Sequence, residues 1–178
     1  MSSCQNHKHC INDALESAHK ICIDRKLRLT ALREQVLRLI WQSHQPLGAY
    51  DLLDMLANAS SRRVAPPTVY RALEFLLDVG LIHRINSLNA YIGCPSPSTE
   101  HPSYFLICTQ CKMASECNSS DLSLHIESLG KEQGFMIQKQ WLEVLGLCQE
   151  CQEDNKEDNK KGNRKENNEK PSSEIKPS

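Results

Sequence analysis

Apolar side chains in the first half of the chain recur at the three- and four-residue spacing of amphipathic helices. Thr30 can cap one such helix, while Pro66 and Gly80 stand just inside the start and just past the end of another. Two short apolar runs then flank the turn residues 86–89, which predicts a β-hairpin over residues 81–94. The pattern therefore predicts a winged helix-turn-helix domain, with helices over residues 10–26, 30–43, 49–57 and 66–79.

The second half predicts a small, separate unit in which strands and a helix alternate. We expect strands over residues 104–108, 112–117 and 135–144, with a helix over residues 121–133. Residues 152–178 contain one aliphatic residue among many Asn, Lys and Glu, so they cannot offset the entropy of ordering. The fold class is therefore α+β, divided into a frayed N-terminus (1–9), a winged-helix domain (10–94), a hinge (95–103), an α/β domain (104–151) and a disordered charged tail (152–178).

Composition narrows the class of protein further. No apolar run reaches the length of a membrane span and the first residues lack a signal-peptide core, so we expect a cytoplasmic protein without membrane contact. In that compartment nine cysteines favour metal thiolates over disulfides. Residues 1–90 carry 11 Lys and Arg against 8 Asp and Glu, whereas residues 91–151 carry 3 against 7. This division favours contact with a polyanion through the N-terminal half and metal binding in the C-terminal half, although ordinary surface variation also produces such differences in charge.

Two Cys-x-x-Cys pairs, Cys108 with Cys111 and Cys148 with Cys151, are separated by 36 residues. Two thiolates at that spacing lie on one turn and can bind one ion, and two such turns complete the tetrahedral sulfur set of structural zinc. The pairs therefore predict a zinc ion that joins the two ends of the second domain. Disulfides or redox-active thiols are the alternative.

A second set of ligand-type residues lies between the hairpin and the first cysteine pair or just after it. These residues are His83, Cys94, His101 and Glu116, and their mixed types suit an exchangeable metal site. With the turn centred on residues 87–88, His83 and Cys94 fall at the base of the hairpin as near or diagonal neighbours. Cys117 adjoins Glu116 and competes with it for the role of fourth ligand.

The fourth predicted helix has the features of a DNA-recognition helix. A stripe of apolar residues would face the core, which leaves Thr68 and Arg71 on the outer surface of the first turns. Arginine can bind guanine O6 and N7 with two hydrogen bonds, and Thr68, Tyr70 and the helix N-terminus suit phosphate oxygens. Tyr50, which opens the preceding helix, could reach a base or phosphate from the side. An exposed arginine is more often simply solvated, but its place before a winged hairpin favours base contact.

Taken together, these residues resemble the ferric uptake regulator family, and within it the zinc uptake regulator branch. The resemblance spans about residues 15–151 and is carried by Leu29, Thr30 and Arg33, by 49–54, 67–76 and 82–94, by both cysteine pairs and by 146–148. It implies a repressor of zinc uptake genes that dimerises through the C-terminal domain (104–151) and binds a palindromic DNA operator when zinc-loaded. It also implies two Zn²⁺ per monomer: a structural ion on Cys108, Cys111, Cys148 and Cys151, and a regulatory ion on His83, Cys94, His101 and Glu116. Tyr50 and Arg71 fall on the base-contacting positions.

The choice of metal rests on the ligand types. Relatives that sense iron use a His-rich run and carboxylates, whereas this chain has the single His101 in that region and a thiolate at Cys94. One sulfur, two imidazoles and one carboxylate favour tetrahedral zinc. A sensor of iron, manganese, nickel or peroxide is the alternative. An enzyme is disfavoured because the motifs of zinc deaminases, zinc proteases and serine hydrolases are missing from the sequence. A terminal group, Cys4, His7, His9 and Cys10, is a further possible metal cluster.

Overall fold

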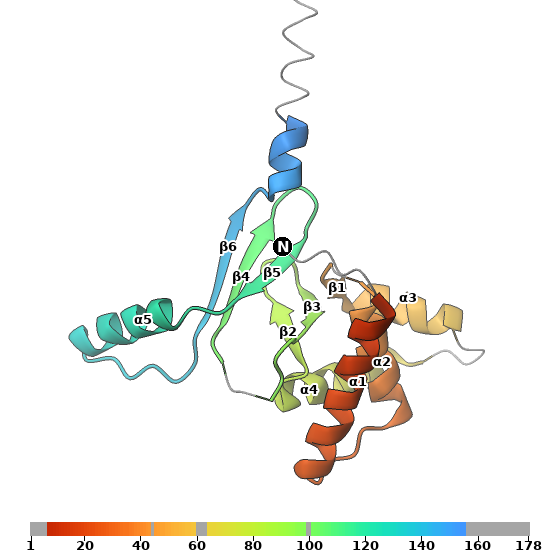
Figure 1. Ribbon diagram of the computed structural model, residues 1–178. Coiled ribbons are helices and arrows are strands. Elements are labelled where there is room, and N and C mark those ends of the chain that lie inside the picture. Colours follow the sequence, from red (N-terminus) through yellow and green to blue (C-terminus); the bar gives the residue numbers. More distant parts are fainter. Residues whose placement is uncertain (1–6, 44, 60–63, 99–100, 156–178) are drawn as a thin grey trace, which may run out of the picture.

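The computed structural model describes residues 7–43, 45–59, 64–98 and 101–155, which form two joined domains (Figure 1). The N-terminal domain packs four helices against a small sheet. The helices are α1 (His7–Asp24), α2 (Ala31–Trp41), α3 (Ala49–Ala59) and α4 (Pro66–Val79), and the strands are β1 (Leu47–Gly48), β2 (Ile82–Ile85) and β3 (Ala90–Gly93). The strand order is β1-β3-β2, with both pairings antiparallel. This is the predicted winged-helix arrangement, in which the β2–β3 hairpin is the wing.

Local sequence explains where these helices begin and end. The hydroxyl of Thr30 accepts a hydrogen bond from the Arg33 N–H at 3.5 Å, which caps α2. Gly80 ends α4 in the left-handed conformation at φ 81°, and the guanidinium of Arg25 donates to the Val79 carbonyl at 3.2 Å. The apolar stripe of α4 is fully buried against the other three helices, as predicted: Val69, Ala72, Leu73 and Leu76.

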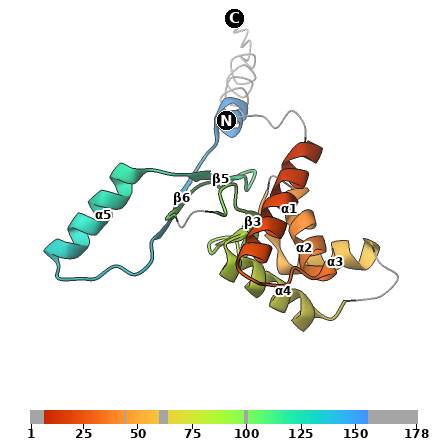
Figure 2. The same cartoon turned by 60° about the horizontal axis from the view of Figure 1, so that its bottom comes forward.

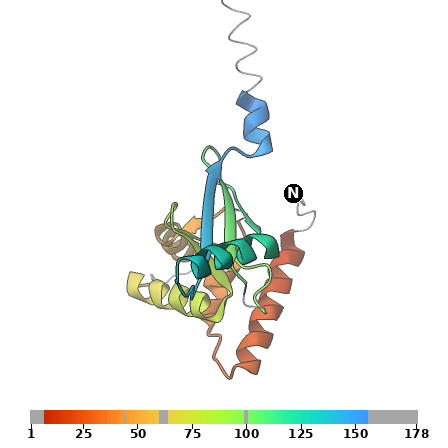
Figure 3. The same ribbon diagram turned by 90° about the vertical axis from the view of Figure 1, so that its left-hand side faces the viewer.

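The C-terminal domain contains β4 (Ser103–Cys108), β5 (Ala114–Cys117), α5 (Ser120–Glu132) and β6 (Trp141–Gly146). The strand order is β5-β4-β6, so β4 is central and β6 is an edge strand. β4 pairs with β5 antiparallel and with β6 parallel. Figure 2 shows α5 standing away from α1–α4, on the side of the sheet opposite to the winged-helix domain, and in Figure 3, seen from that side, α5 lies in front of the sheet. A helical segment over residues 149–155 ends the described chain, so residues 152–155, which we expected to belong to the disordered tail, are helical instead.

Several expectations about element bounds were wrong. The last strand begins at Trp141 rather than at 135 and runs on to Gly146, because β4 begins at Ser103 and offers no pairing partner to residues 135–140. The second strand of this domain begins at 114, since residues 109–113 form the turn that carries Cys111. Residues 7–9, expected to fray, belong to α1. The short strand β1 was not predicted.

The wing lies on one face of the C-terminal sheet, so the two domains meet along it. Ile85 at the end of β2 packs with Phe105 and Ile107 of β4 and with Ala114, and Leu88 and Ile92 flank this cluster. The contact holds the hairpin against the sheet and brings its base close to β5. None of the helices in the described part of the chain combines the length and apolar character that crossing a membrane requires.

Candidate metal centres and nucleic-acid interface

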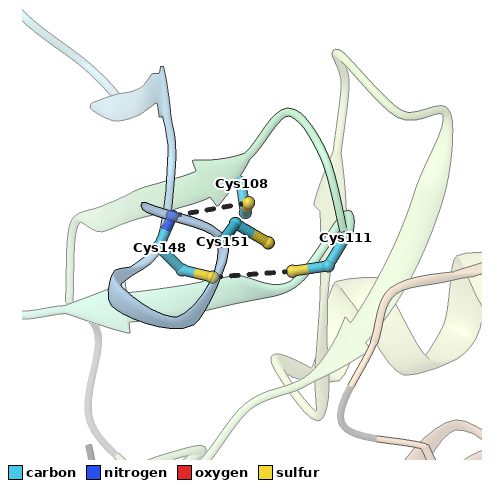
Figure 4. A group of neighbouring side chains, drawn as sticks. All are labelled: Cys108, Cys111, Cys148 and Cys151. Carbon is cyan, nitrogen blue, oxygen red and sulfur yellow. Dashed lines mark hydrogen bonds between the residues drawn. The ribbon is translucent and has the colours of Figure 1, made fainter. Parts of the chain in front are cut away.

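The two cysteine pairs meet at one end of the C-terminal sheet. Cys108 ends β4 and Cys111 lies on the following turn, while Cys148 and Cys151 come just after β6. Because β4 and β6 run parallel with Cys108 opposite Gly146, both pairs emerge at the same edge. The four sulfurs lie within 4.8 Å of one another, and Figure 4 shows them converging on a shared centre. We call these four residues the four-cysteine site.

The spacing of the sulfurs fits a single zinc ion. Two sulfurs bound tetrahedrally at about 2.3 Å from zinc lie about 3.8 Å apart, and the sulfurs of Cys111 and Cys148 are 3.7 Å apart. Hydrogen bonds from the N–H groups of Cys148 and Cys111 lower the pKa of the Cys108 thiol to about 6, which favours the thiolate. Burial and the neighbouring thiols raise the pKa of Cys151 to about 12. Among the described residues, these four cysteines are not paired in disulfides.

The second ligand set assembles where the wing meets the C-terminal sheet. His83 lies on β2, Cys94 directly follows β3, His101 belongs to the segment between the domains and Glu116 lies on β5. One ligand atom from each lies within 4.8 Å of the others. In the hairpin His83 faces Ile92, which makes Cys94 its diagonal neighbour, as the turn position predicted. We call these four residues the hinge site.

The hydrogen bonds inside the hinge site leave some buried polar atoms without a partner, and a metal ion could bind these atoms. Nε2 of His101 lies 2.8 Å from Oε1 of Glu116 and 3.7 Å from the Cys94 sulfur. Nδ1 of His83 contacts the Ser103 hydroxyl at 3.0 Å, which orients the imidazole so that its Nε2 faces the centre. That Nε2 is 3.2 Å from Oε1 of Glu116 but lacks hydrogen-bond geometry, and Oε2 of Glu116 also has no partner. Buried polar atoms without partners are unusual, so the donor set fits a bound cation.

The electrostatics of the hinge site agree with that interpretation. Burial raises the pKa of the Cys94 thiol to about 12, with the Glu116 carboxylate adding to the effect. Burial acts on the Glu116 carboxyl in the same direction, but the neighbouring imidazoles of His83 and His101 outweigh it and lower its pKa. A dication would offset the cost of burying the thiolate and carboxylate together.

Cys117 does not join the hinge site. Successive residues of β5 point to opposite faces, so Cys117 faces away from Glu116, and its thiol lies 3.5 Å from the Tyr104 carbonyl oxygen. Of the terminal group, Cys4 lies outside the described residues, and His7, His9 and Cys10 belong to α1. His9 pairs with Asp13 at 3.2 Å within that helix.

The predicted DNA-contacting side chains lie on the outer surface of the N-terminal domain. Thr68 and Arg71 are exposed on the first turns of α4, opposite the buried stripe. Tyr70 is 39% exposed, and Tyr50, in the first turn of α3, is 75% exposed. The structure therefore leaves all four available to a ligand, and the open N-terminus of α4 adds backbone N–H groups suited to phosphate.

Two further residues shape the hinge site without being metal-ligand residue types. The sequence therefore did not point to them. Ser103 orients His83, and Phe105 packs edge-on against the same imidazole with ring centres 5.5 Å apart. Both lie on β4, between the strand that supplies Glu116 and the strand β6. The alternation of β4 places Ser103 and Phe105 on one face, but only the packing of the wing on that face gives them a role.

The chain belongs to the ferric uptake regulator family, whose model matches residues 24–145. Within the family it belongs to the zinc uptake regulator branch: it is 37% identical to the zinc uptake regulation protein of Escherichia coli (strain K12) over 147 residues, which cover 82% of this chain and 85% of the relative. A solved zinc uptake regulator complexed with zinc and DNA superimposes with a TM-score of 0.78 at 37% identity, over 82% of this chain and 97% of that one.

A second solved relative, holo XcZur, gives a TM-score of 0.71 at 43% identity and covers 79% of this chain and 97% of its own. Both superpositions include the winged-helix domain and the C-terminal domain together. The arrangement of the two domains described above is therefore similar to that of two solved zinc uptake regulators.

Proposed function

We propose that this protein is a zinc-responsive repressor that binds operator DNA when zinc-loaded and so controls zinc uptake genes. The main support for this proposal is the hinge site. Two of its ligands come from the wing, and the other two come from the segment between the domains and from β5. Metal affinity at such a site depends on how the two domains lie against each other. The likeness to a zinc uptake regulator complexed with zinc and DNA supports the same conclusion.

Two zinc ions per protomer follow from the two ligand sets. The four-cysteine site would hold a structural ion, since all four ligands are sulfurs at the ends of two paired strands. The hinge site would hold the regulatory ion through His83, Cys94, His101 and Glu116. Zinc bound there would supply a Lewis acid whose charge offsets those of the thiolate and the carboxylate. The residues of the chain do the rest: Ser103 orients His83, and Phe105 supports it.

Coupling between metal and DNA would arise by linkage. The four hinge ligands lie together only when the wing rests on the C-terminal sheet. A ligand favours a conformation only to the extent that it binds that conformation more tightly. Zinc binding at the hinge therefore favours the domain arrangement described here, and DNA binding to that arrangement raises zinc affinity by the same factor.

We also propose a homodimer formed through the C-terminal domain. β6 is an edge strand with unpaired backbone groups. The sheet face turned away from the wing carries Leu106 of β4, 54% exposed, beside Val144 of β6, 46% exposed and paired with it in register. α5 also exposes two apolar side chains, Leu124 and Leu129. A second copy of the chain is the partner that would cover an apolar surface of this kind.

A two-fold dimer would present two copies of α4 and thus read a palindromic operator. In each half-site Arg71 and Tyr50 would contact base edges, while Thr68, Tyr70 and the α4 N-terminus would contact phosphates. Such a regulator acts on DNA in the cytoplasm without catalysing a reaction. The competing function is a sensor of iron, manganese, nickel or peroxide, and the single thiolate with two imidazoles at the hinge argues against it.

The test combines metal content with DNA binding. Purified protein is dialysed against a chelator of moderate strength, zinc per protomer is measured, and operator retardation is titrated with buffered Zn²⁺, Fe²⁺, Mn²⁺ and Ni²⁺. The proposal expects one zinc retained after dialysis and DNA binding restored at the lowest free concentration by Zn²⁺. Restoration by Fe²⁺ or Mn²⁺ at lower free concentration than Zn²⁺ would replace the proposal with the competing function.

A further inference from the structure

The tip of the wing is held by a carboxylate from the C-terminal domain that belongs to neither ligand set. Glu143 lies in the middle of β6. Its Oε1 accepts a hydrogen bond from the Asn86 N–H at 2.6 Å, and its Oε2 accepts one from the Ser87 N–H at 2.9 Å. These two residues open the turn between β2 and β3. The carboxylate thus binds two successive backbone N–H groups, an arrangement that gives strong, charge-assisted hydrogen bonds.

The register of the sheet places this contact in line with the hinge site. Phe105 of β4 is paired with Glu143 of β6 on one side and with Glu116 of β5 on the other. All three side chains therefore lie on the face that carries the wing. Glu116 meets the base of the wing at His83, Phe105 packs against the same imidazole, and Glu143 meets the tip. The wing is thus contacted at both ends by one row of residues.

The charge state of Glu143 suits this contact. Partial burial acts to raise the pKa of its carboxyl, but hydrogen bonds from the Ser87 side chain and from the N–H groups of Ser87 and Asn86 outweigh burial and lower it. Glu143 is therefore ionised at neutral pH and can accept from both donors at once. Backbone N–H groups at an exposed turn would otherwise be solvated, so the contact forms only when the wing lies on the sheet.

We propose that Glu143 is a positioning residue that latches the wing onto the C-terminal sheet and thereby raises the zinc sensitivity of the hinge site without binding the metal. The proposal rests on the proposed function. The wing position that lets Glu143 reach residues 86 and 87 is also the position that brings His83 and Cys94 to His101 and Glu116. A contact present only in the ligand-assembled arrangement increases the population of that arrangement, and apparent zinc affinity rises with that population.

The decisive variant is Glu143→Gln. It keeps the shape of the side chain but removes the negative charge. It also replaces one acceptor oxygen with an NH2 donor, which would face a backbone N–H. Glu16→Gln, on the exposed surface of α1, is the control for the loss of one negative charge. Ser87→Ala is a second variant, placed on the wing, that removes only the side-chain contribution. Each full-length protein is measured for hinge-site zinc affinity by chelator competition without DNA, for operator binding against free zinc, for zinc per protomer and for amide exchange at residues 86 and 87.

We expect Glu143→Gln to raise the free zinc concentration needed for half-occupancy of the hinge site by about three- to tenfold. This is the effect expected for losing a charge-assisted hydrogen bond that solvent already weakens. The midpoint for operator binding should move equally, while zinc per protomer and maximal operator binding at saturating zinc stay unchanged. Amide exchange at 86 and 87 should quicken, and Ser87→Ala should shift the midpoint less. An unchanged hinge affinity in Glu143→Gln, or an equal shift in Glu16→Gln, would overturn the latch.

These measurements separate the latch from the proposed function. Chelator competition and amide exchange need no DNA, so a wild-type protein that failed to bind DNA in response to zinc would contradict the proposed function alone. A zinc-responsive wild type with a Glu143→Gln variant of unaltered midpoint would contradict the latch alone. If Glu143→Gln does not fold, the Ser87→Ala variant decides. A higher free zinc for half-occupancy of the hinge site in Ser87→Ala supports the latch. An unchanged free zinc for half-occupancy, with slow amide exchange retained at residues 86 and 87, refutes the latch.

Discussion

The indole of Trp41 rests directly on the backbone of Gly93. A Cβ added to Gly93 would lie 2.4 Å from Cε2 of Trp41, closer than any ordinary contact between these atoms. Trp41 ends α2, and Gly93 ends β3 immediately before the hinge ligand Cys94. The close approach therefore fixes how the wing sits on the helices and, through one peptide bond, where the Cys94 thiol lies.

Gly93→Ala is predicted to destabilise the N-terminal domain and to weaken the hinge site together. Overpacking of this kind costs about 1–3 kcal/mol in the free energy of unfolding, and displacement of β3 moves Cys94 away from His101. Thermal unfolding and zinc competition measure the two effects. Gly146→Ala is the control, since a Cβ there meets nothing within 4 Å. Equal behaviour of the two variants would show that the Trp41 contact can relax freely.

The four-cysteine site is predicted to be required for a folded C-terminal domain. Replacing Cys108, Cys111, Cys148 or Cys151 with Ser should remove the structural zinc, whose binding contributes about 10–16 kcal/mol in small zinc domains. Far-UV circular dichroism, zinc content and size-exclusion chromatography should show loss of zinc, of the C-terminal fold and of the dimer. Cys117→Ser is the matched control because its thiol faces away from both metal sites. Folded, dimeric, zinc-containing protein from all four variants would refute a structural role.

Much of the fold and of the site can be predicted because the determining features are local in sequence. The stripe containing Val69 and Leu76 indicates α4, and the turn position fixes the diagonal relation of His83 and Cys94. The start of β6 could not be predicted, since it depends on where β4 begins and not on residues 135–140 themselves. The contacts of Ser103 with His83 and of Glu143 with the wing link positions far apart in sequence through packing of one domain on the other.

The apolar sheet face that holds Leu106 and Val144 is predicted to form the dimer contact. Leu106→Asp should produce monomers, because it places a charge at the centre of a surface that the partner would bury without a compensating cation. Sedimentation equilibrium on the zinc-loaded protein measures the effect. Ile23→Asp is the control, since Ile23 is 74% exposed on α1, in the other domain. A Leu106→Asp protein that remained dimeric at the wild-type dissociation constant would place the contact elsewhere.

Arg71→Ala is predicted to lose sequence discrimination more than general attraction to DNA. A bidentate contact with guanine contributes about 1–3 kcal/mol of discrimination, whereas the proposed phosphate contacts of Thr68 and the α4 N-terminus would remain. Operator and scrambled duplexes are titrated at one fixed salt concentration. Lys131→Ala, at the far end of α5, is the control for loss of one positive charge. Equal losses on both duplexes would mean that Arg71 contacts only the DNA backbone.

Cys94→Ser is predicted to leave a folded dimer that no longer binds DNA in response to zinc. Cys94 supplies the only thiolate of the hinge site, and a serine hydroxyl is a far weaker zinc ligand, so the hinge would lose its ion while the four-cysteine site keeps its own. Zinc per protomer should fall from about two to about one, with the dimer intact, because the hinge and the four-cysteine site share no ligand. Zinc content, oligomeric state and zinc-dependent operator binding are measured on the same preparation, beside Cys117→Ser. Wild-type operator binding at free zinc levels that saturate the parent protein would contradict the role of the hinge, and loss of the dimer would instead assign Cys94 to the structural site.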